Sequence, residues 1–174
     1  MNAALRTALA IVLAVPMLGS AQPEPAAVSP ADAQKPVEQK FFIETPDDEA
    51  MLKAELAKAK AAGKLAVIVF GADWCHDSRS LAKVLTSPAF TAEFGPRFAV
   101  IFVDVGVPQA GQGRNLDLVK HFGVKHMKGT PAMFVISPNG KRLNSKKDAV
   151  SWRNAESRSQ DYVFGWFRNL FLKH

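Results

Sequence analysis

The chain has 174 residues, of which 48% are hydrophobic and 22% are charged, and its formal net charge at pH 7 is +6. This length suits one domain with a good core, and the composition is ordinary for a soluble globular protein. The single cysteine excludes a disulfide within the chain, so its thiol stays free, is capped, or pairs with another molecule.

Residues 1–21 are predicted to be an export signal. A short basic start, residues 1–6, precedes an apolar run, residues 8–18, which is too short to span a bilayer comfortably. The small residues 19–21 suit a signal peptidase, so we expect cleavage after Ala21. The expected product is exported, periplasmic if the source is bacterial, and not stably inserted in a membrane. An uncleaved membrane anchor is the alternative.

Residues 22–40 contain four prolines and no large aromatic residue, which predicts a flexible spacer. We expect the folded domain to occupy residues 41–174. No cysteine follows the apolar run of the signal, which excludes a lipoprotein form.

Helix and strand patterns alternate along the first half of this domain. Residues 45–48 combine a capping hydroxyl, a proline and two acids, which predicts a helix start, and Gly63 ends that helix. The apolar runs at residues 65–70 and 98–105 predict strands covered on both faces. A short helix is expected between them, from Ser87 to about Gly95.

The second half is expected to be less regular. We predict a loop at residues 106–113, a short helix at 114–121 and a strand at 132–136. The turn residues Asn139–Gly140 then indicate a hairpin to a further strand. A last helix packed on the sheet follows from apolar residues at helical spacing, namely Val163, Trp166, Phe167 and Leu170.

Positive charge concentrates in residues 141–158. The basic residues there are Lys141, Arg142, Lys146, Lys147, Arg153 and Arg158. An anionic partner would suit this charge. Trp152 is the only aromatic residue of the segment, however, and export argues against nucleic acid. We therefore expect a solvated loop and no nucleic-acid partner.

The only cysteine lies at the junction of a strand pattern and a helix pattern. Residues 64–85 read KLAVIVFGADWCHDSRSLAKVL, in which Cys75 opens the helical spacing. A helix N-terminus favours thiolate over thiol, and thiolate is the nucleophile in disulfide exchange. Cys75 is therefore interpreted as a reactive thiol, with a small buried hydrophobe as the alternative. Arg79, one helical turn on, carries a charge that would stabilise the thiolate.

This arrangement resembles the thioredoxin-like superfamily over about residues 42–171. In that family a strand ends in a segment like FGADWC, and a C-x-x-C or C-x-x-S motif begins the next helix; here Ser78 takes the last position. A later Thr-Pro, here Thr130–Pro131, carries a cis peptide bond that faces the cysteine. The resemblance implies an α/β fold of three layers, with a central mixed β-sheet flanked by helices, and an exposed thiol.

The resemblance also implies roles for the site residues. Cys75 would attack a disulfide, while Ser78 and Arg79 would stabilise its thiolate. Trp74 would flank the thiol, and Thr130–Pro131 would position an extended substrate segment.

Four further observations limit the chemistry that we expect at Cys75. Val69 stands where thioredoxins often have a buried carboxylate that accepts a proton. His126 is either an acid or base for Cys75 or a surface histidine, and we favour the surface interpretation. No paired Cys or His spacing supports a metal site, copper included, so none is expected. Peroxiredoxins have a Thr or Ser three residues before their cysteine, and here that residue is Ala72, so a peroxidase of that kind is not expected.

The sequence therefore predicts an exported thioredoxin-like protein that exchanges thiols and disulfides through one cysteine. Ser78 cannot attack a mixed disulfide, so an external thiol such as glutathione would resolve it, without a bound cofactor. The partners would be protein or small-molecule disulfides and thiols. The alternative is a non-catalytic module that binds or retains thiols in the same groove.

Overall fold

The computed structural model describes residues 39–172. The expected signal at residues 1–21 and the spacer up to residue 38 lie outside the described residues. Gln39 and Lys40, at the end of the expected spacer, are exposed and have no regular structure. Among the described residues, no helix combines the length and the apolar character needed to cross a membrane.

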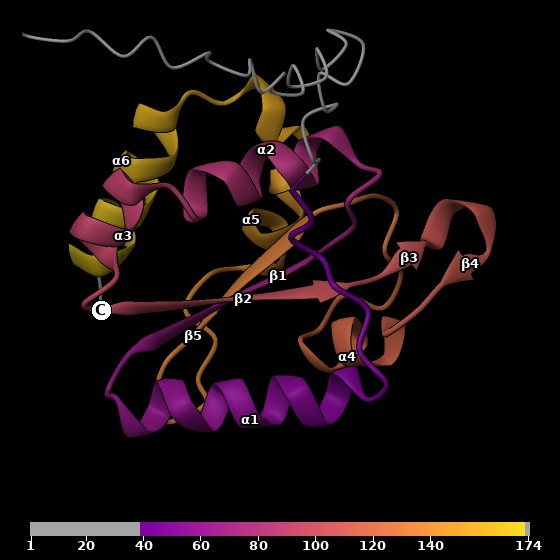
Figure 1. Cartoon of the computed structure of the whole chain (residues 1–174), viewed down its shortest axis with the longest axis horizontal. Coiled ribbons are helices and arrows are strands. Elements are labelled where there is room, and N and C mark those ends of the chain that lie inside the picture. The colour runs from indigo at the N-terminus through magenta and orange to yellow at the C-terminus, as the bar shows by residue number, and fades with distance from the viewer. Residues whose placement is uncertain (1–38, 173–174) are drawn as a thin grey trace, which may run out of the picture. The chain divides into compact units, whose positions relative to one another are not determined.

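Helices and short strands alternate along the described chain (Figure 1). The α-helices are α1 (Asp48–Ala61), α2 (His76–Leu85), α3 (Pro88–Phe94), α4 (Leu116–His121), α5 (Lys146–Ser151) and α6 (Gln160–Leu172). The 3-10 helices are η2 (Pro108–Ala110) and η3 (Trp152–Ser157). The strands are β1 (Leu65–Gly71), β2 (Phe98–Asp104), β3 (Gly106–Val107), β4 (Gln112–Gly113) and β5 (Ala132–Ile136).

The central sheet is mixed and has the strand order β2-β1-β5. β1 pairs in parallel with β2, where Gly71 lies opposite Asp104. β1 pairs antiparallel with β5, where Phe70 lies opposite Ala132. The carboxyl ends of β1 and β2 therefore lie beside the start of β5, at one end of the strands.

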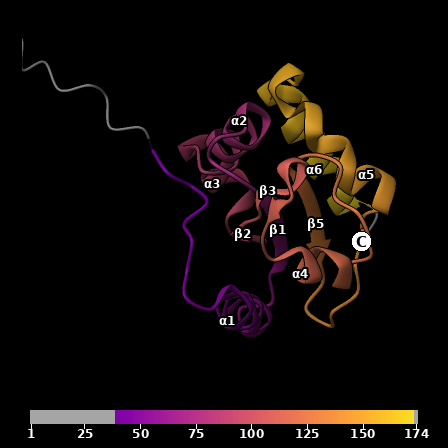
Figure 2. The ribbon, with the colours of Figure 1, turned by 90° about the vertical axis from the view of Figure 1, so that its right-hand side faces the viewer.

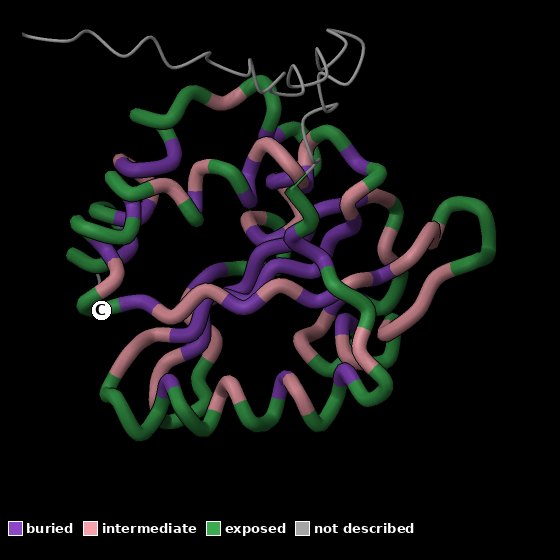
Figure 3. Tube along the Cα trace, viewed as in Figure 1, coloured by how far each residue is buried: buried purple, intermediate pink, exposed green. Residues whose placement is uncertain are grey.

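Helices cover both faces of this sheet, as the sequence predicted (Figures 1 and 2). Because side chains alternate along a strand, Val67 and Val69 of β1 pack on the side of α2, α3 and α6. Ile68 and Phe70 pack on the opposite side, with α1 and α4. β1 and β5 are accordingly the most continuously buried strands, and they appear as purple stretches of the tube in Figure 3.

A cluster of phenylalanines fastens α3 and α6 to the start of β2. Its ring centroids lie 4.8 to 6.0 Å apart, and most pairs are edge-on, the geometry that aromatic quadrupoles favour. The members are Phe90, Phe94, Phe98, Phe164 and Phe167.

The first helix starts two residues later than the sequence indicated. Asp47 is the N-cap of α1, and its side chain accepts a hydrogen bond from Ala50 N at 2.8 Å. The Thr45 hydroxyl instead donates to Asp48 Oδ1 at 2.6 Å. Gly63 follows the helix with φ +67°, a conformation that suits glycine.

One expectation about the strands is confirmed and one is wrong. β2 is covered on both faces, as predicted, because Phe98 packs with α3 and α6 while Ile101 and Val103 pack on the side of α1. β2 also lies at the edge of the sheet, where Ala99, Val100 and Phe102 are only half-buried. Residues 106–113 form the hairpin β3–β4, with η2 at its tip, where a loop was predicted.

The strand expected after Asn139–Gly140 is reduced to one bridge, between Ile136 and Arg142. The Asn144 side chain ends the pairing, because it accepts from Val135 N at 3.0 Å and donates to Met133 O at 2.8 Å. It thereby occupies the backbone groups that a longer strand would use.

The predicted solvated loop at residues 141–158 instead contains α5 and η3. Ala149 and Trp152 anchor these helices in the core and are fully buried. Arg158 lies over the Trp152 ring at 4.2 Å and donates to Ser151 O at 2.7 Å. Four of the six basic residues are exposed, so part of the segment's charge does face solvent.

The close contact at the end of β1 gives a test of this packing. A Cβ on Gly71 would lie 2.6 Å from the Phe42 ring and 2.8 Å from Ser78 Oγ, whereas one on Gly165 in α6 would meet nothing. We expect Gly71→Ala to lower the free energy of unfolding by about 1–3 kcal/mol. The control, Gly165→Ala, should raise it by about 0.5–1 kcal/mol. Urea denaturation measures both, and a neutral Gly71→Ala would contradict the packing.

Candidate functional site

Cys75 lies at the N-cap position of α2, with an extended backbone (φ −86°, ψ 123°). Its carbonyl accepts a hydrogen bond from Arg79 N at 3.1 Å, the first bond of the helix. Its side chain makes no capping hydrogen bond, and Sγ donates instead to the Thr130 carbonyl at 3.5 Å. The thiol is therefore held between the start of a helix and the segment before β5.

The thiol is more enclosed than the sequence indicated. Cys75 is only 9% exposed, where an exposed position was expected. The cause is its contact with Thr130, which is itself buried and is joined to the buried Pro131 by a cis peptide bond. A reagent must therefore reach Sγ beside the Thr130 carbonyl that accepts its hydrogen bond.

Ser78 lies on the inner side of α2 and is fully buried. Among the described residues its hydroxyl has no hydrogen-bond partner, so the expected bond to Cys75 is not formed in this state. The hydroxyl instead lies against the turn after β1, next to Gly71 and the Phe42 ring. A buried hydroxyl without a partner costs stability, so this position is not optimised for folding alone.

Arg79 braces the turn that precedes Cys75. Its guanidinium donates to the Asp73 carbonyl. The Asp73 carboxylate in turn accepts from Phe41 N at 3.0 Å and Phe42 N at 3.3 Å, which ties the start of the domain to this turn. Asp73 is part of the FGADWC segment, but the sequence analysis assigned it no role.

Trp74 forms the exposed side of the site, with 47% of its surface accessible. Its indole Nε1 donates to the Gly106 carbonyl at 2.8 Å, which connects the site to the hairpin β3–β4. His126 is exposed, in keeping with the surface interpretation, and Val69 is fully buried in the core. The described residues contain no group of three or more His, Cys, Asp or Glu side chains that could hold a metal ion.

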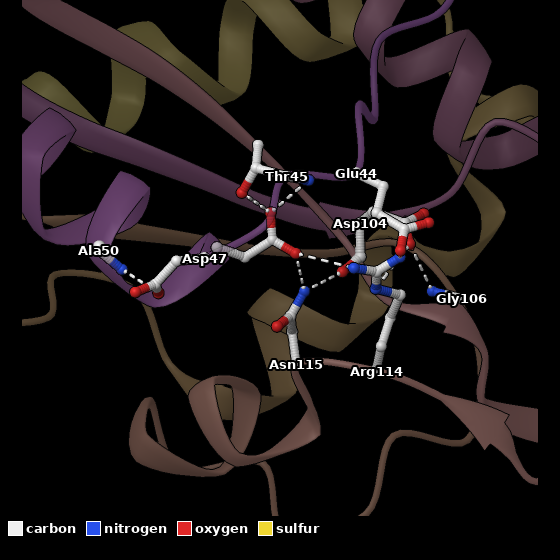
Figure 4. A network of polar contacts seen from close by, with 9 residues as sticks. Glu44, Thr45, Asp47, Ala50, Asp104, Gly106, Arg114 and Asn115 are labelled. Atoms are coloured by element: carbon white, nitrogen blue, oxygen red, sulfur yellow. Dashed lines mark hydrogen bonds and ion pairs between the residues drawn. The ribbon is translucent and has the colours of Figure 1, made fainter.

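A charged cluster that the sequence analysis missed lies beyond Gly106 (Figure 4). Asn115 Nδ2 donates to Asp48 Oδ2 at 2.6 Å and to the Asp104 carbonyl at 2.8 Å. The Arg114 guanidinium lies among three carboxylates. It pairs with Glu44, and its nitrogens lie 3.4 Å from Asp48 Oδ2 and 3.5 Å from Asp104 Oδ2. The sequence did contain one signal for this cluster, because Asp104 is a charged residue at the end of the apolar run that forms β2.

The Asp104 carboxylate is partly desolvated. Burial raises the pKa of Asp104 above its ordinary value of 3.8, and the negative charges of Asp48 and Asp73 act in the same direction. The hydrogen bond from Gly106 N to Asp104 Oδ2, 3.0 Å long, opposes them. Ionised Asp104 therefore carries a cost that depends on pH.

That cost has a definite sign. Between pH 3.8 and the raised pKa of Asp104, the folded protein binds more protons than the unfolded chain, so the free energy of unfolding rises as pH falls. Asp104→Asn keeps an oxygen acceptor for Gly106 but cannot titrate. We expect its stability relative to the wild type to be greatest above the raised pKa and to decline toward pH 3.8.

Urea denaturation across pH measures this difference, with Asp117→Asn on the exposed surface of α4 as the control. A pH-independent difference between Asp104→Asn and the wild type would contradict the assignment.

Comparisons with known proteins identify the family of this fold. The profile of a family described as thioredoxin-like matches residues 48–138. The crystal structure of a disulphide isomerase from Xylella fastidiosa Temecula1 is 31% identical, with a TM-score of 0.67, and the match covers 76% of this chain and 98% of that chain. The reduced C-terminal domain of Neisseria meningitidis DsbD is 26% identical, with a TM-score of 0.41, over 68% of this chain and 100% of that domain.

No curated protein matches the chain. The family profile spans more than half of the sequence, and the 31% identity to the isomerase extends over nearly the whole of that protein. The chain therefore belongs to the thioredoxin-like family.

Proposed function

We propose that the protein carries out thiol–disulfide exchange through Cys75, with an external thiol completing each cycle. The observation that carries the proposal is the position of Sγ, at the start of α2 and 3.5 Å from the carbonyl that precedes the cis bond to Pro131. Membership of the thioredoxin-like family supports it, as does the similarity to a protein described as a disulphide isomerase.

The reaction balances without a cofactor. Cys75 loses its proton to solvent, and the thiolate attacks one sulfur of a disulfide, which forms a Cys75 mixed disulfide and releases the other sulfur as a thiolate. A second thiolate, such as that of glutathione, then attacks the substrate sulfur, which frees Cys75 and yields a new disulfide. No net oxidation occurs. The external thiol is needed because the chain has no second cysteine.

Neighbouring residues are proposed to support these steps. Loss of the thiol proton releases Sγ from the Thr130 carbonyl, and the partial positive charge at the start of α2 then favours the anion. Arg79 contributes a positive charge on the same turn, and the unpartnered Ser78 hydroxyl is available as a donor to the thiolate. Thr130–Pro131 and Trp74 would flank the incoming substrate.

A second function is favoured by the burial of Cys75. A thiol that is 9% exposed and has no resolving cysteine forms mixed disulfides slowly and releases them slowly. The same site would then bind or retain a thiol partner without turnover. In both cases the partners are protein or small-molecule thiols and disulfides, and we propose that the protein meets them after export.

Reaction with oxidised glutathione tests the exchange function. We expect one glutathione adduct per molecule, faster at higher pH because the thiolate is the reacting form, and full reversal by reduced glutathione. Intact mass spectrometry follows both steps, and Cys75→Ser is the control that should gain no mass. Absence of an adduct would contradict exchange and leave a structural role for Cys75.

A second thiol at position 78 separates the two functions. Ser78→Cys should form a disulfide between Cys75 and the introduced thiol and gain dithiol reductase activity, because position 78 is one helical turn from the N-cap. Ser80→Cys adds the same group elsewhere on α2 and should not. Thiol titration and reduction of a protein disulfide measure the gain. Failure of Ser78→Cys alone, with its fold intact, would favour the binding module.

A further inference from the structure

The hairpin β3–β4 bonds to the site at one point and lies near it at another. On one side the Gly106 carbonyl accepts the Trp74 indole hydrogen bond at 2.8 Å. On the other side Gln109 Nε2 lies 3.9 Å from the place that a Cβ on Gly129 would take, one residue before Thr130. The hairpin therefore adjoins both segments that flank Cys75.

The root of this hairpin is anchored in the charged cluster. Gly106 N donates to Asp104 Oδ2 at 3.0 Å, and Arg114 N donates to the Val105 carbonyl at 3.0 Å. The Arg114 guanidinium lies 3.5 Å from the same Asp104 oxygen, and it also pairs with Glu44 and Asp48. One residue, Gly106, thus separates the cluster from the indole: its N–H bonds to Asp104 and its carbonyl bonds to Trp74.

The backbone at Gly106 has little room to move. Its φ is +59°, and a Cβ there would lie 2.5 Å from the Gln112 carbonyl, so the backbone of the two strands is closely packed. Trp74, by contrast, is half exposed, and no other aromatic ring of the described residues packs against it. The hydrogen bond to Gly106 is accordingly a main restraint on its position.

We infer that Arg114 and Asp104 are positioning residues: through Gly106 they hold Trp74 beside Cys75 and so set how readily reagents reach the sulfur. The inference rests on the proposed function only in taking Cys75 as the reacting group. Alkylation of Cys75 reports access directly and needs no disulfide exchange. A failed glutathione reaction would therefore overturn the proposed function and leave this inference standing.

Arg114→Gln removes the charge that joins the three carboxylates. We expect alkylation of Cys75 by iodoacetamide, an uncharged probe, to become about three- to tenfold faster, the factor that one lost hydrogen bond supports. Trp74→Phe, which deletes the indole donor, should accelerate it similarly. Arg168→Gln on α6 removes the ion pair with Glu93 of α3 and is the matched control, with no change expected.

A double-variant cycle identifies the route of the effect. If Arg114 acts through the indole, Arg114→Gln should produce no further acceleration in a Trp74→Phe background. Equal acceleration in both backgrounds would overturn the inference, as would an unchanged rate in Arg114→Gln. If Arg114→Gln does not fold, Arg114→Lys can replace it, because lysine retains the charge but has fewer hydrogen-bond donors. We expect Arg114→Lys to accelerate alkylation of Cys75 by a smaller factor. An unchanged alkylation rate in Arg114→Lys would also overturn the inference.

Discussion

The site depends on the pairing of β1 with a different neighbour on each side. Parallel pairing places Asp104 of β2 beside Gly71, and antiparallel pairing places Ala132 of β5 beside Phe70. Three segments therefore meet at the same end of the strands: the turn to Cys75, the start of the hairpin β3–β4 and the Thr130–Pro131 segment. Residues 55 positions apart in the chain, Cys75 and Thr130, meet because of this register.

Much of this arrangement could be predicted from the sequence because its signals are local. The apolar run of β1, the break at Gly71 and the helical spacing after Cys75 predicted the strand, turn and helix. The resemblance to a known superfamily supplied the mixed sheet and its three layers. The serine cap and proline of α3 were likewise visible, since Ser87 and Pro88 act within one turn.

The remaining features depend on contacts between distant segments. Asn144 replaces a strand by bonding to Val135 and Met133, and no pattern in its own segment indicates that pairing. α5 is short and polar, and it is fixed by the burial of Ala149 and the following Trp152. The cluster around Arg114 assembles from segments far apart in the sequence, so no local pattern indicated that its members would pair.

A single enclosed sulfur gives the site its particular character. The Thr130 carbonyl holds the thiol, the position one turn away is a buried serine, and the exposed Trp74 precedes the cysteine in the chain. Under the proposed mechanism such a site would favour a mixed disulfide that persists until another thiol enters. The rate of that second step would then decide whether the protein exchanges or retains its partner.

The decisive measurement is the release of the Cys75–glutathione adduct as a function of added reduced glutathione. The account predicts that release follows the thiol concentration linearly, that the protein regains its free thiol, and that the cycle repeats without loss. An adduct that persists at every thiol concentration would contradict exchange and establish the site as one that retains its partner.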